Sequence, residues 1–526
     1  MRLGFGWLVV GLVACAGGKD SAVPSDSTPV SDTDTDADAD ADTDTDTDTD
    51  TDTDTDTDTD TSPPEGLVAT VEDLHIVVAK TIVLDGQVAA PAAVSCVLTT
   101  DAEEVHTASS EAEATHHEIA LFGLLADSTY DCEATSGALA TGFQLTTEPL
   151  PDYIPDMSVE RGKGEMVGAY TLFNHFSLAG ILLADHVGLV VDPEGRPRWY
   201  HSIELTVTGD VDFRHVGGGE FLIGGGSAGT PFVGGKTTSP RIVDLWGQEV
   251  WRGPDPEPDT SYHHHAERLA DGTVLTIAAK NVDYDKTTYV DSIIERIDPK
   301  TNARIFTWST VQGLDQGALT LDSPVSADDP FHINWLGQTA DGDLLASMRN
   351  ANAVARIDAV DGTVEWVLGA GGDFTLVDRK GVALPDNEWF GEQHGLSVEG
   401  DRLLVYDNTH FEGEDASTRV VELQLDEATM TATQLWTYEE EGWLEPIFGS
   451  AYHLPDDHVL IGMGHCWICE ETFHGVGVDH WSAVVELDVD QQVVWRLTFP
   501  SEASGLYRAD RLDGCDLFAN AKYCNP

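Results

Sequence analysis

The stretch FHINWLGQTADGDLLASMRNANAVARIDAVDGTVEW, residues 331–366, repeats one simple pattern. An apolar run is followed by an Asp-Gly pair, a second apolar run and a second Asp-Gly pair, and the stretch closes with Val-Glu-Trp. Asp-Gly pairs between short apolar runs are strong signals for tight turns between antiparallel strands. We therefore predict that this stretch forms a small antiparallel sheet of four strands.

The pattern occurs six times along the chain, in units of roughly 50–70 residues. Each unit closes with a tryptophan that has an apolar residue one or two positions before it: Trp199, Trp251, Trp308, Trp366, Trp436 and Trp495. Four-stranded sheets repeated radially form a β-propeller, in which the packing of neighbouring sheets protects their edges. We predict an all-β chain with a six-bladed β-propeller in residues 149–526 and the tryptophans on or near the outer strands. A long sandwich or a solenoid is the alternative.

The charge of the chain excludes one class of function. Among 526 residues, 93 are acidic and 27 are basic, which gives a formal net charge of −66. Proteins that bind nucleic acids need a basic surface, so this chain is not expected to bind them.

The N-terminus predicts export. Residues 1–14 carry one positive charge and a short apolar run, as secretory signal peptides do. The LVAC sequence that ends at Cys15 is typical of a bacterial lipoprotein processing site, and an ordinary signal peptide with an incidental cysteine is the alternative. Residues 15–64 are rich in Asp-Thr repeats and predict an extended, disordered acidic tether. We expect a lipid-anchored protein in the periplasm or at the cell surface, with the outer membrane as the expected site.

Residues 65–148 alternate apolar and polar residues in short runs, which predicts a small β-sandwich of the fibronectin-III or immunoglobulin type. LLADSTYDCEAT is similar to the tyrosine-corner strand of fibronectin-III-like domains, with Tyr130 as the corner residue. Beyond Cys15 the chain has six cysteines, and an exported chain with an even number favours disulfides. The simplest pairing joins neighbours, although other connectivities stay open: Cys96–Cys132, Cys466–Cys469 and Cys515–Cys524.

Polar residues occur where the first strands of the middle units begin. His264, His332 and His394 each lie shortly before a turn in units three, four and five. Asn334 is two residues beyond His332 and is expected on the same face of its strand. Arg349 is expected on the following strand, returning toward the axis. Because the inner strands of a propeller converge, we predict that these five side chains surround one cavity.

Two of these features have metal-binding alternatives. His263, His264 and His265 are common ligand types for zinc and copper, but adjacent strand residues point to opposite faces. Cys466 and Cys469 with the preceding His465 would make half a zinc site or a redox pair. No second Cys-x-x-Cys exists in the chain, so a structural disulfide is the preferred interpretation.

The ordered series of motifs over residues 148–512 resembles the bacterial arylsulfate sulfotransferases. The series is HHHAERLADGTVL, FHIN followed by Ser-x-Arg, VEWVLG, EQHG followed by LLVYDN, TRVVELQLD and GLYRADRL. The resemblance implies an exported six-bladed propeller with a small N-terminal β-sandwich. It also implies transfer of a sulfuryl group from an aryl sulfate to a phenol without a soluble cofactor.

The resemblance assigns roles to single residues. His394 matches the nucleophile that becomes a sulfohistidine, His332 and Asn334 match the His-x-Asn pair, and Arg349 matches the arginine of the family. His264 matches the histidine of the third blade, because it lies five residues before Leu269. Where the family has an acidic residue next, this chain has His265, so His263 and His265 stay open as alternatives.

Two other functions are compatible with parts of the sequence. A surface-anchored propeller that binds a ligand or a protein without turnover would keep the fold, but it would not need the histidines, Asn334 and Arg349 together. A quinone-dependent dehydrogenase is the third hypothesis, but its calcium and quinone ligands are not recognisable in the sequence. The expected partners are therefore an aryl sulfate donor and a phenol acceptor, with membrane contact only through the lipid at Cys15. Oligomeric state stays open, since the family contains dimers.

Overall fold

A computed structural model describes residues 66–177, 186–203, 212–225, 238–410, 416–440, 443–445, 447–464, 482–499 and 504–524. The predicted signal peptide, Cys15, the tether and the predicted Cys466–Cys469 disulfide lie outside these residues. Within the described residues, no helix has both the length and the apolar character needed to cross a membrane.

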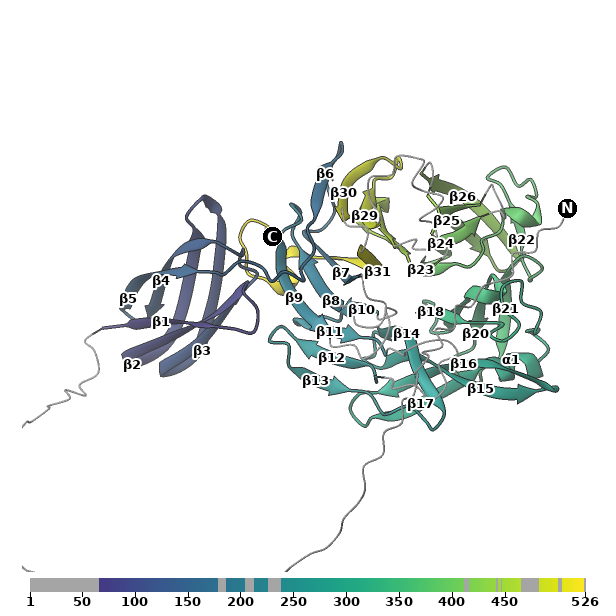
Figure 1. Cartoon of the computed structure of the whole chain (residues 1–526), viewed down its shortest axis with the longest axis horizontal. Helices are drawn as coiled ribbons and strands as arrows, with labels where there is room; N and C mark the ends of the chain where they lie inside the picture. The colour runs from purple at the N-terminus through teal and green to yellow at the C-terminus, as the bar shows by residue number, and fades with distance from the viewer. Residues whose placement is uncertain are drawn as a thin grey trace, which may run out of the picture. The chain divides into compact units, whose positions relative to one another are not determined.

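Six sheets follow one another around the region predicted to be a propeller (Figure 1). Their strands, each sheet in order from the inner strand outward, are as follows. The first sheet is β31 (Ser504–Leu512), β7 (Tyr170–Ser177), β8 (His186–Val191) and β9 (Pro197–Ile203), the second is β10 (Phe213–His215), β11 (Glu220–Ile223), β12 (Arg241–Asp244) and β13 (Glu249–Arg252), and the third is β14 (Thr260–Arg268), β15 (Val274–Tyr284), β16 (Thr287–Asp298) and β17 (Ala303–Ser309). The fourth is β18 (Ile333–Gln338), β19 (Leu344–Met348), β20 (Ala353–Ile357) and β21 (Val364–Gly369), the fifth is β23 (His394–Glu399), β24 (Arg402–His410), β25 (Ser417–Asp426), β26 (Thr431–Glu439) and β22 (Thr375–Val377), and the sixth is β27 (Ser450–His453), β28 (Val459–Met463), β29 (Ser482–Leu487), β30 (Val493–Phe499) and β6 (Ser158–Arg161).

The described residues also include short helical segments, of which α3 follows the last strand and the others lie between strands. They are α1 (Thr310–Asp315), the 3-10 turns η2 (Arg349–Ala351), η3 (Asp386–Glu388) and η5 (Pro455–Asp457), and α3 (Gly514–Leu517). The predicted all-β fold is confirmed, and each of the six sheets contains the four expected strands, to which β22 adds a fifth strand in the fifth sheet and β6 in the sixth.

The inner strands hold neighbouring sheets together. β14 contacts β18, β18 contacts β23, β23 contacts β27, β27 contacts β31, and β31 contacts β10, while β14 contacts β11 of the second sheet. Contacts between adjacent sheets therefore run through all six. The first sheet combines strands from both ends of the repeat region, because β31 pairs with β7. This is the arrangement that propeller blades adopt to protect their edges.

The six tryptophans lie on the fourth strand of each sheet, as predicted. Several of their indole N–H groups donate to the next sheet: Trp199 to the carbonyl of Leu245, Trp308 to that of Gly362, and Trp495 to that of Pro193. The bond from Trp495 joins the sixth sheet to the first. In this way the repeated tryptophan fastens each of these sheets to a turn of its neighbour.

Residues 68–146 form five strands, β1 (Val68–Asp73), β2 (Ala79–Leu98), β3 (Asp101–Phe122), β4 (Thr129–Ser136) and β5 (Leu139–Thr146). All five belong to one hydrogen-bonded sheet, in which the long β2 pairs with β1, β3 and β4. Leu125 donates its backbone N–H to the Tyr130 hydroxyl at 2.8 Å, which is the expected tyrosine corner. The Cys96–Cys132 disulfide joins paired positions of β2 and β4, as predicted.

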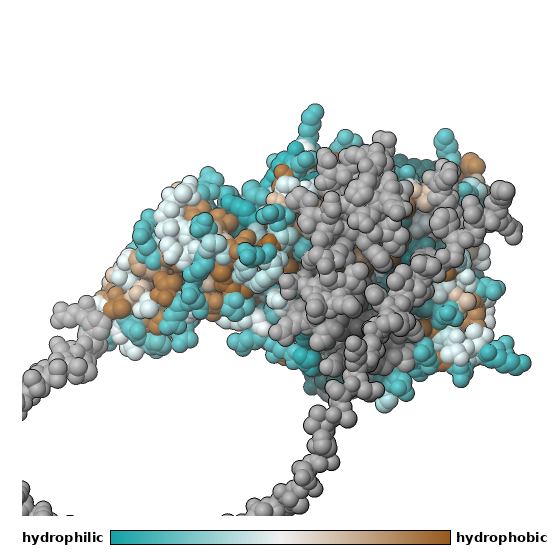
Figure 2. Space-filling model, in the orientation of Figure 1, coloured by the Kyte–Doolittle hydropathy of each residue, from teal (hydrophilic) through white to brown (hydrophobic). Residues whose placement is uncertain are grey.

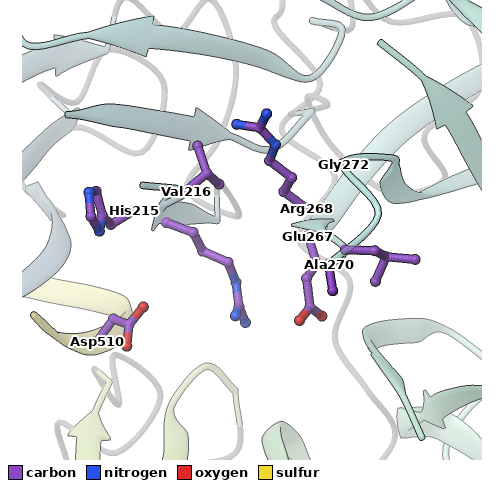
Figure 3. Close-up of a pocket in the computed structure, with 9 residues that line it drawn as sticks. His215, Val216, Glu267, Arg268, Ala270, Gly272 and Asp510 are labelled. Atoms are coloured by element: carbon purple, nitrogen blue, oxygen red, sulfur yellow. The ribbon is translucent and has the colours of Figure 1, made fainter. Parts of the chain in front are cut away.

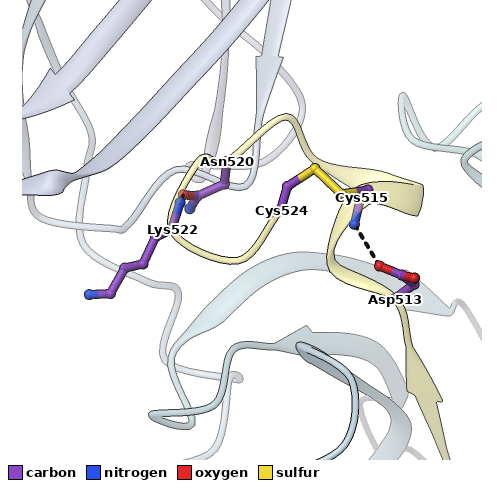
Figure 4. The surroundings of a disulfide bond; sticks show 5 residues. All are labelled: Asp513, Cys515, Asn520, Lys522 and Cys524. Atoms are coloured by element: carbon purple, nitrogen blue, oxygen red, sulfur yellow. Dashed lines mark hydrogen bonds between the residues drawn. A yellow bond between two sulfur atoms is a disulfide. The ribbon is translucent and has the colours of Figure 1, made fainter. Parts of the chain in front are cut away.

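The C-terminal segment after β31 packs against β3. The predicted Cys515–Cys524 disulfide closes a short loop there (Figure 4). Backbone hydrogen bonds link Thr107 to Ala519 and Ala521 to Val105. Nearby, Arg198 of β9 is fully buried and donates to Glu104 of β3 and to Asp192. A buried cation shared by two carboxylates in this way fixes β3 against β9.

Hydrophilic residues cover most of the described surface that faces the viewer in Figure 2, with hydrophobic residues scattered among them. The exposed large hydrophobic side chains include Val88, Trp246 and Val360. Single exposed hydrophobic residues of this kind are normal for a folded domain.

Candidate functional site

Four inner strands are interrupted by β-bulges. The pairing register shifts between His263 and Ala266 in β14, Ile333 and Trp335 in β18, His394 and Ser397 in β23, and Leu506 and Ala509 in β31. A bulge bends its strand and re-aims side chains, and bulges are common beside active sites. The candidate residues His264, Asn334 and His394 lie inside or directly beside these bulges.

His264 and His332 meet directly. Their Nε2 atoms are 2.9 Å apart, so one of the two nitrogens carries a hydrogen and the other accepts it. The other ring nitrogen of His332, Nδ1, lies 2.5 Å from the Asp329 carboxylate. Burial would raise the pKa of Asp329, but the His332 ring holds it below its usual value. The three residues therefore form a connected chain from blade three to the loop before β18.

His394 is held in one tautomer. Its Nδ1 lies 2.8 Å from the Asn408 side-chain oxygen and 3.1 Å from the Glu392 carbonyl oxygen, and both are acceptors. The Asn408 amide nitrogen donates to the carbonyls of Glu445 and Phe448, which fixes the orientation of the amide. Nδ1 therefore carries the hydrogen, and Nε2 carries the lone pair.

The electrostatics around His394 keep it neutral. The side chain is 3% exposed, and burial together with the positive charge of Arg349 holds the pKa of His394 well below its usual range. The hydrogen bond to Asn408 opposes this shift without reversing it. Burial and the neighbouring imidazoles lower the pKa of His264 in the same way. At neutral pH both rings are unprotonated bases.

Gly395 allows the backbone after His394 to lie directly against the backbone of Gly449 and Ser450. A Cβ at this position would lie 2.4 Å from the Cα of Ser450 and 2.5 Å from the carbonyl oxygen of Gly449. Only glycine fits between β23 and the entrance of β27, so the sequence His-Gly is a packing requirement of the bulge.

Arg349 differs from the prediction in its local structure. It is the first residue of η2, after the end of β19, and not a strand residue. Its guanidinium donates to the Asn350 side chain and to Glu392, the residue two positions before His394. Glu392 thus bonds both residues: its carboxylate accepts from Arg349, and its backbone carbonyl accepts from the ring of His394. Arg349 is therefore connected to His394 through Glu392.

The local structure around Asn334 is irregular. The bulge in β18 breaks the simple alternation of faces, and the Asn334 amide nitrogen donates to the Gln393 carbonyl at 2.7 Å. The side chain is fully buried, and its Oδ1 has no hydrogen-bond partner among the described residues. Asn334 therefore supports the backbone directly before His394.

The neighbours of His264 take different positions. His265 lies 3.0 Å from Asp212 and contacts Arg508, so its ring is bonded to these two charged residues. The ring of His263 stands edge-on to that of His264, and burial lowers its pKa to about 3. Of the three histidines, His264 is the one whose ring nitrogen contacts His332. Within the described part of the chain, no cluster of His, Cys, Asp and Glu residues is suited to hold a metal ion.

The backbone at the site is strained. His264, His332 and Glu392 all have positive φ angles, of 58°, 49° and 49°. Left-handed backbone costs about 1–3 kcal/mol for a residue other than glycine and clusters at active sites. The strained residues are therefore two of the site histidines and the residue two positions before the third, His394.

Three side chains at the site were not among the sequence candidates: Asp329, Asn408 and Arg508. Each follows from a local signal that is weak alone. Asp329 is three residues before His332, Asn408 ends the LLVYDN run, and Arg508 is a charged residue inside the otherwise apolar start of β31.

Comparison with known proteins identifies the family. Residues 183–508 match the model of the family described as Arylsulfotransferase (ASST). No curated protein matches the chain.

Solved structures give a weaker likeness. A protein of unknown function from Bacteroides caccae is 12% identical over 65% of this chain and 98% of that chain, with a TM-score of 0.43. A putative 6-phosphogluconolactonase from Bacteroides fragilis is 13% identical over 82% of this chain and 97% of that chain, with a TM-score of 0.33. Virginiamycin B lyase from Staphylococcus aureus is 10% identical over 65% and 73%, with a TM-score of 0.27. Likenesses at this level carry no argument about function.

Proposed function

Because the chain belongs to the arylsulfotransferase family, we propose that it moves a sulfuryl group from an aryl sulfate to a phenol in two steps through a sulfohistidine at His394. The proposal includes no soluble sulfate carrier. The observation that supports it best is the fixed tautomer of His394, which leaves Nε2 as a neutral nucleophile.

In the first half-reaction, His394 Nε2 forms a bond to sulfur while the bond between sulfur and the aryl oxygen breaks. Charge spreads over the three remaining sulfuryl oxygens in the transition state. A planar guanidinium stabilises such charge well, and Arg349 supplies one beside the loop of His394.

The departing phenolate takes a proton from the histidine pair. The Asp329 carboxylate contacts Nδ1 of His332, so Nε2 is the ring nitrogen from which His332 would pass a proton. That proton lies on the 2.9 Å axis shared with His264 Nε2. His332 is therefore the proposed general acid, and His264 holds the proton in place between turnovers.

The neutral acceptors at Nδ1 keep the intermediate reactive. Attack through Nε2 gives an imidazolium ring that still carries its Nδ1 proton. Asn408 and the Glu392 carbonyl accept this proton as a hydrogen bond, but neither is basic enough to remove it. The ring therefore stays cationic and remains a good leaving group.

In the second half-reaction, a phenol acceptor reverses these steps. It gives its proton to His332 and attacks sulfur, and the bond between sulfur and His394 Nε2 breaks. Protons and charge balance over the two halves, so the cycle needs no further reactant.

A labelling experiment tests the proposal. The protein is incubated with 4-nitrophenyl sulfate, and intact mass is measured before and after addition of phenol. We expect a gain of one sulfuryl group on His394 that phenol discharges, and no gain in His394→Ala. Full activity in His394→Ala would refute the nucleophile assignment, and hydrolysis that phenol does not stimulate would indicate a sulfatase.

We also propose that the chain is exported and anchored by a lipid on Cys15, because residues 1–14 have the pattern of a signal peptide that ends before a cysteine. Detergent phase partitioning of the full chain and of Cys15→Ser tests this. The wild type should enter the detergent phase and the variant the aqueous phase, and equal partitioning would refute the anchor.

A further inference from the structure

Arg508 is a buried cation at the centre of the fold that the proposed mechanism does not use. It lies in the bulge of β31 and is 4% exposed. One terminal nitrogen, Nη1, donates to Asp212 at 2.8 Å and contacts His265 at 2.5 Å. The other, Nη2, donates to the backbone carbonyl of Asn334 at 2.7 Å. The guanidinium also stacks 4.7 Å from the centre of the Tyr507 ring.

These contacts cross the centre of the propeller. β31 belongs to the first of the six sheets and β18, which carries Asn334, to the fourth. In a ring of six, the first and fourth sheets face each other across the axis. The hydrogen bond from Arg508 to Asn334 is therefore a brace between opposite blades, with Asp212 and His265 bonded to it from the second and third.

A cavity lies next to this brace, two residues further along the strands that carry it. It has a volume of about 460 Å³ and includes Arg214, Glu267 and Asp510 in its lining (Figure 3). These residues follow Asp212, His265 and Arg508 by two positions on the same stretches of chain. The cavity thus lies toward the ends of β10, β14 and β31, while His332 and His394 lie at the starts of β18 and β23.

The brace is connected to His394 in two ways. Asn334 receives Arg508 on its carbonyl and donates its amide to the Gln393 carbonyl, so two hydrogen bonds link the guanidinium to the residue before His394. The guanidinium lies 4.7 Å from the centre of the Tyr507 ring, and the His264 ring stacks on that same ring with the two centres 6.0 Å apart. Burial is the main cause that lowers the pKa of His264 and His394, and the nearby charge of Arg508 acts in the same direction.

We propose that Arg508 is a positioning residue for sulfuryl transfer, which braces Asn334 from the opposite blade and keeps a fixed positive charge beside His264 and His394. The role rests on the proposed function of the site. The brace requires the two terminal nitrogens of the guanidinium. The neutral state of the imidazoles requires its positive charge.

Arg511 provides a matched control on the same strand. Its guanidinium is also buried and donates to Glu486 and Thr171 at 2.7 and 2.8 Å. Its two partners lie on β29 and β7, whereas Arg508 is bonded to Asp212, His265 and Asn334. Arg511→Gln should therefore cost stability as Arg508→Gln does, without changing the imidazoles.

The test measures the histidines independently of sulfuryl transfer. The rate at which diethyl pyrocarbonate modifies His394 is followed by peptide mass spectrometry as a function of pH, because only the neutral imidazole reacts. In Arg508→Gln the acid limb of this profile should move to higher pH, since a positive charge has been removed. In Arg511→Gln and Arg508→Lys, which leave a cation at position 508, the limb should stay in place.

Turnover supplies the second readout. Arg508→Gln and Arg508→Lys should both lose about 10²–10³ in kcat with KM changed less than about threefold, because the brace acts on the reacting groups. If Arg508→Gln and Arg511→Gln share one modification profile and differ only in melting temperature, Arg508 is a structural residue and the inference is wrong. A wild type that does not turn over aryl sulfates would instead refute the proposed function. The modification profile would still show whether the charge of Arg508 acts on His394.

Discussion

Replacing Asn408 by aspartate tests the tautomer argument at its most sensitive point. The substituted side chain keeps nearly the same shape and places a carboxylate where the amide oxygen now lies, 2.8 Å from His394 Nδ1. At that distance and an effective dielectric constant of about 20, the attraction between the carboxylate and an imidazolium is about 6 kcal/mol, or about 4 pKa units as an upper bound. The change therefore raises the pKa of His394 and protonates Nε2 over a wider pH range.

The assay is the pH dependence of phenol release in a single turnover. In Asn408→Asp the acid limb should move upward by at least about one unit, because a protonated Nε2 cannot attack sulfur. The sulfated enzyme should also persist longer in intact-mass measurements, because the carboxylate can take the Nδ1 proton and weaken the leaving group. Asn408→Ala serves as the control, with a lower rate and no upward shift. An acid limb in Asn408→Asp that coincides with the wild type would refute the reasoning.

Further predictions concern the proton donor and the stability of the fold. Asp329→Asn should lower kcat by about 10²-fold, and by more for aryl sulfates with poor leaving groups, in a series of substituted phenyl sulfates. Removing the Cys96–Cys132 disulfide with a pair of alanines should cost about 4 kcal/mol in urea unfolding, given its separation of 36 residues, while activity per folded molecule is unchanged. Tyr130→Phe should cost about 1 kcal/mol in the same assay, since the hydrogen bond from Leu125 is lost. Burial raises the pKa of Glu445 to about 8 from 4.5, so the folded protein holds a proton that the unfolded chain has released, and the unfolding free energy should fall as pH rises through this window. Glu445→Gln should remove that fall, and identical pH dependence in variant and wild type would contradict it.

The fold could be predicted because its signals are local and repeated. Each sheet is marked by turn residues and by an aromatic residue on the fourth strand. The repeat can therefore be recognised even where the signal of one sheet is missed. The third sheet shows the limit of this approach. There the register shift pairs Phe306 with Arg296 at the position that tryptophan takes in the other sheets, and Trp308 lies two residues further on.

The candidate site could be predicted in its residue types but not in its contacts. The histidines stand out because imidazoles at the start of inner strands serve no purpose in a sheet core. Counting by two from His332 placed Asn334 on the same face, and the bulge in β18 breaks that count. Arg508 was missed because its partner Asn334 is 174 residues away in the sequence, and only the ring brings them together.

The pairing of β31 with β7 has a consequence for the order in which the molecule is assembled. β31 comes after every other described strand, and it carries both Tyr507 and Arg508 into the centre. All strands of the second to sixth sheets, which carry His264, His332 and His394, precede β31 in the sequence. The centre stays without its brace until that final strand docks on β7, so the proposed chemistry depends on the last strand of the chain.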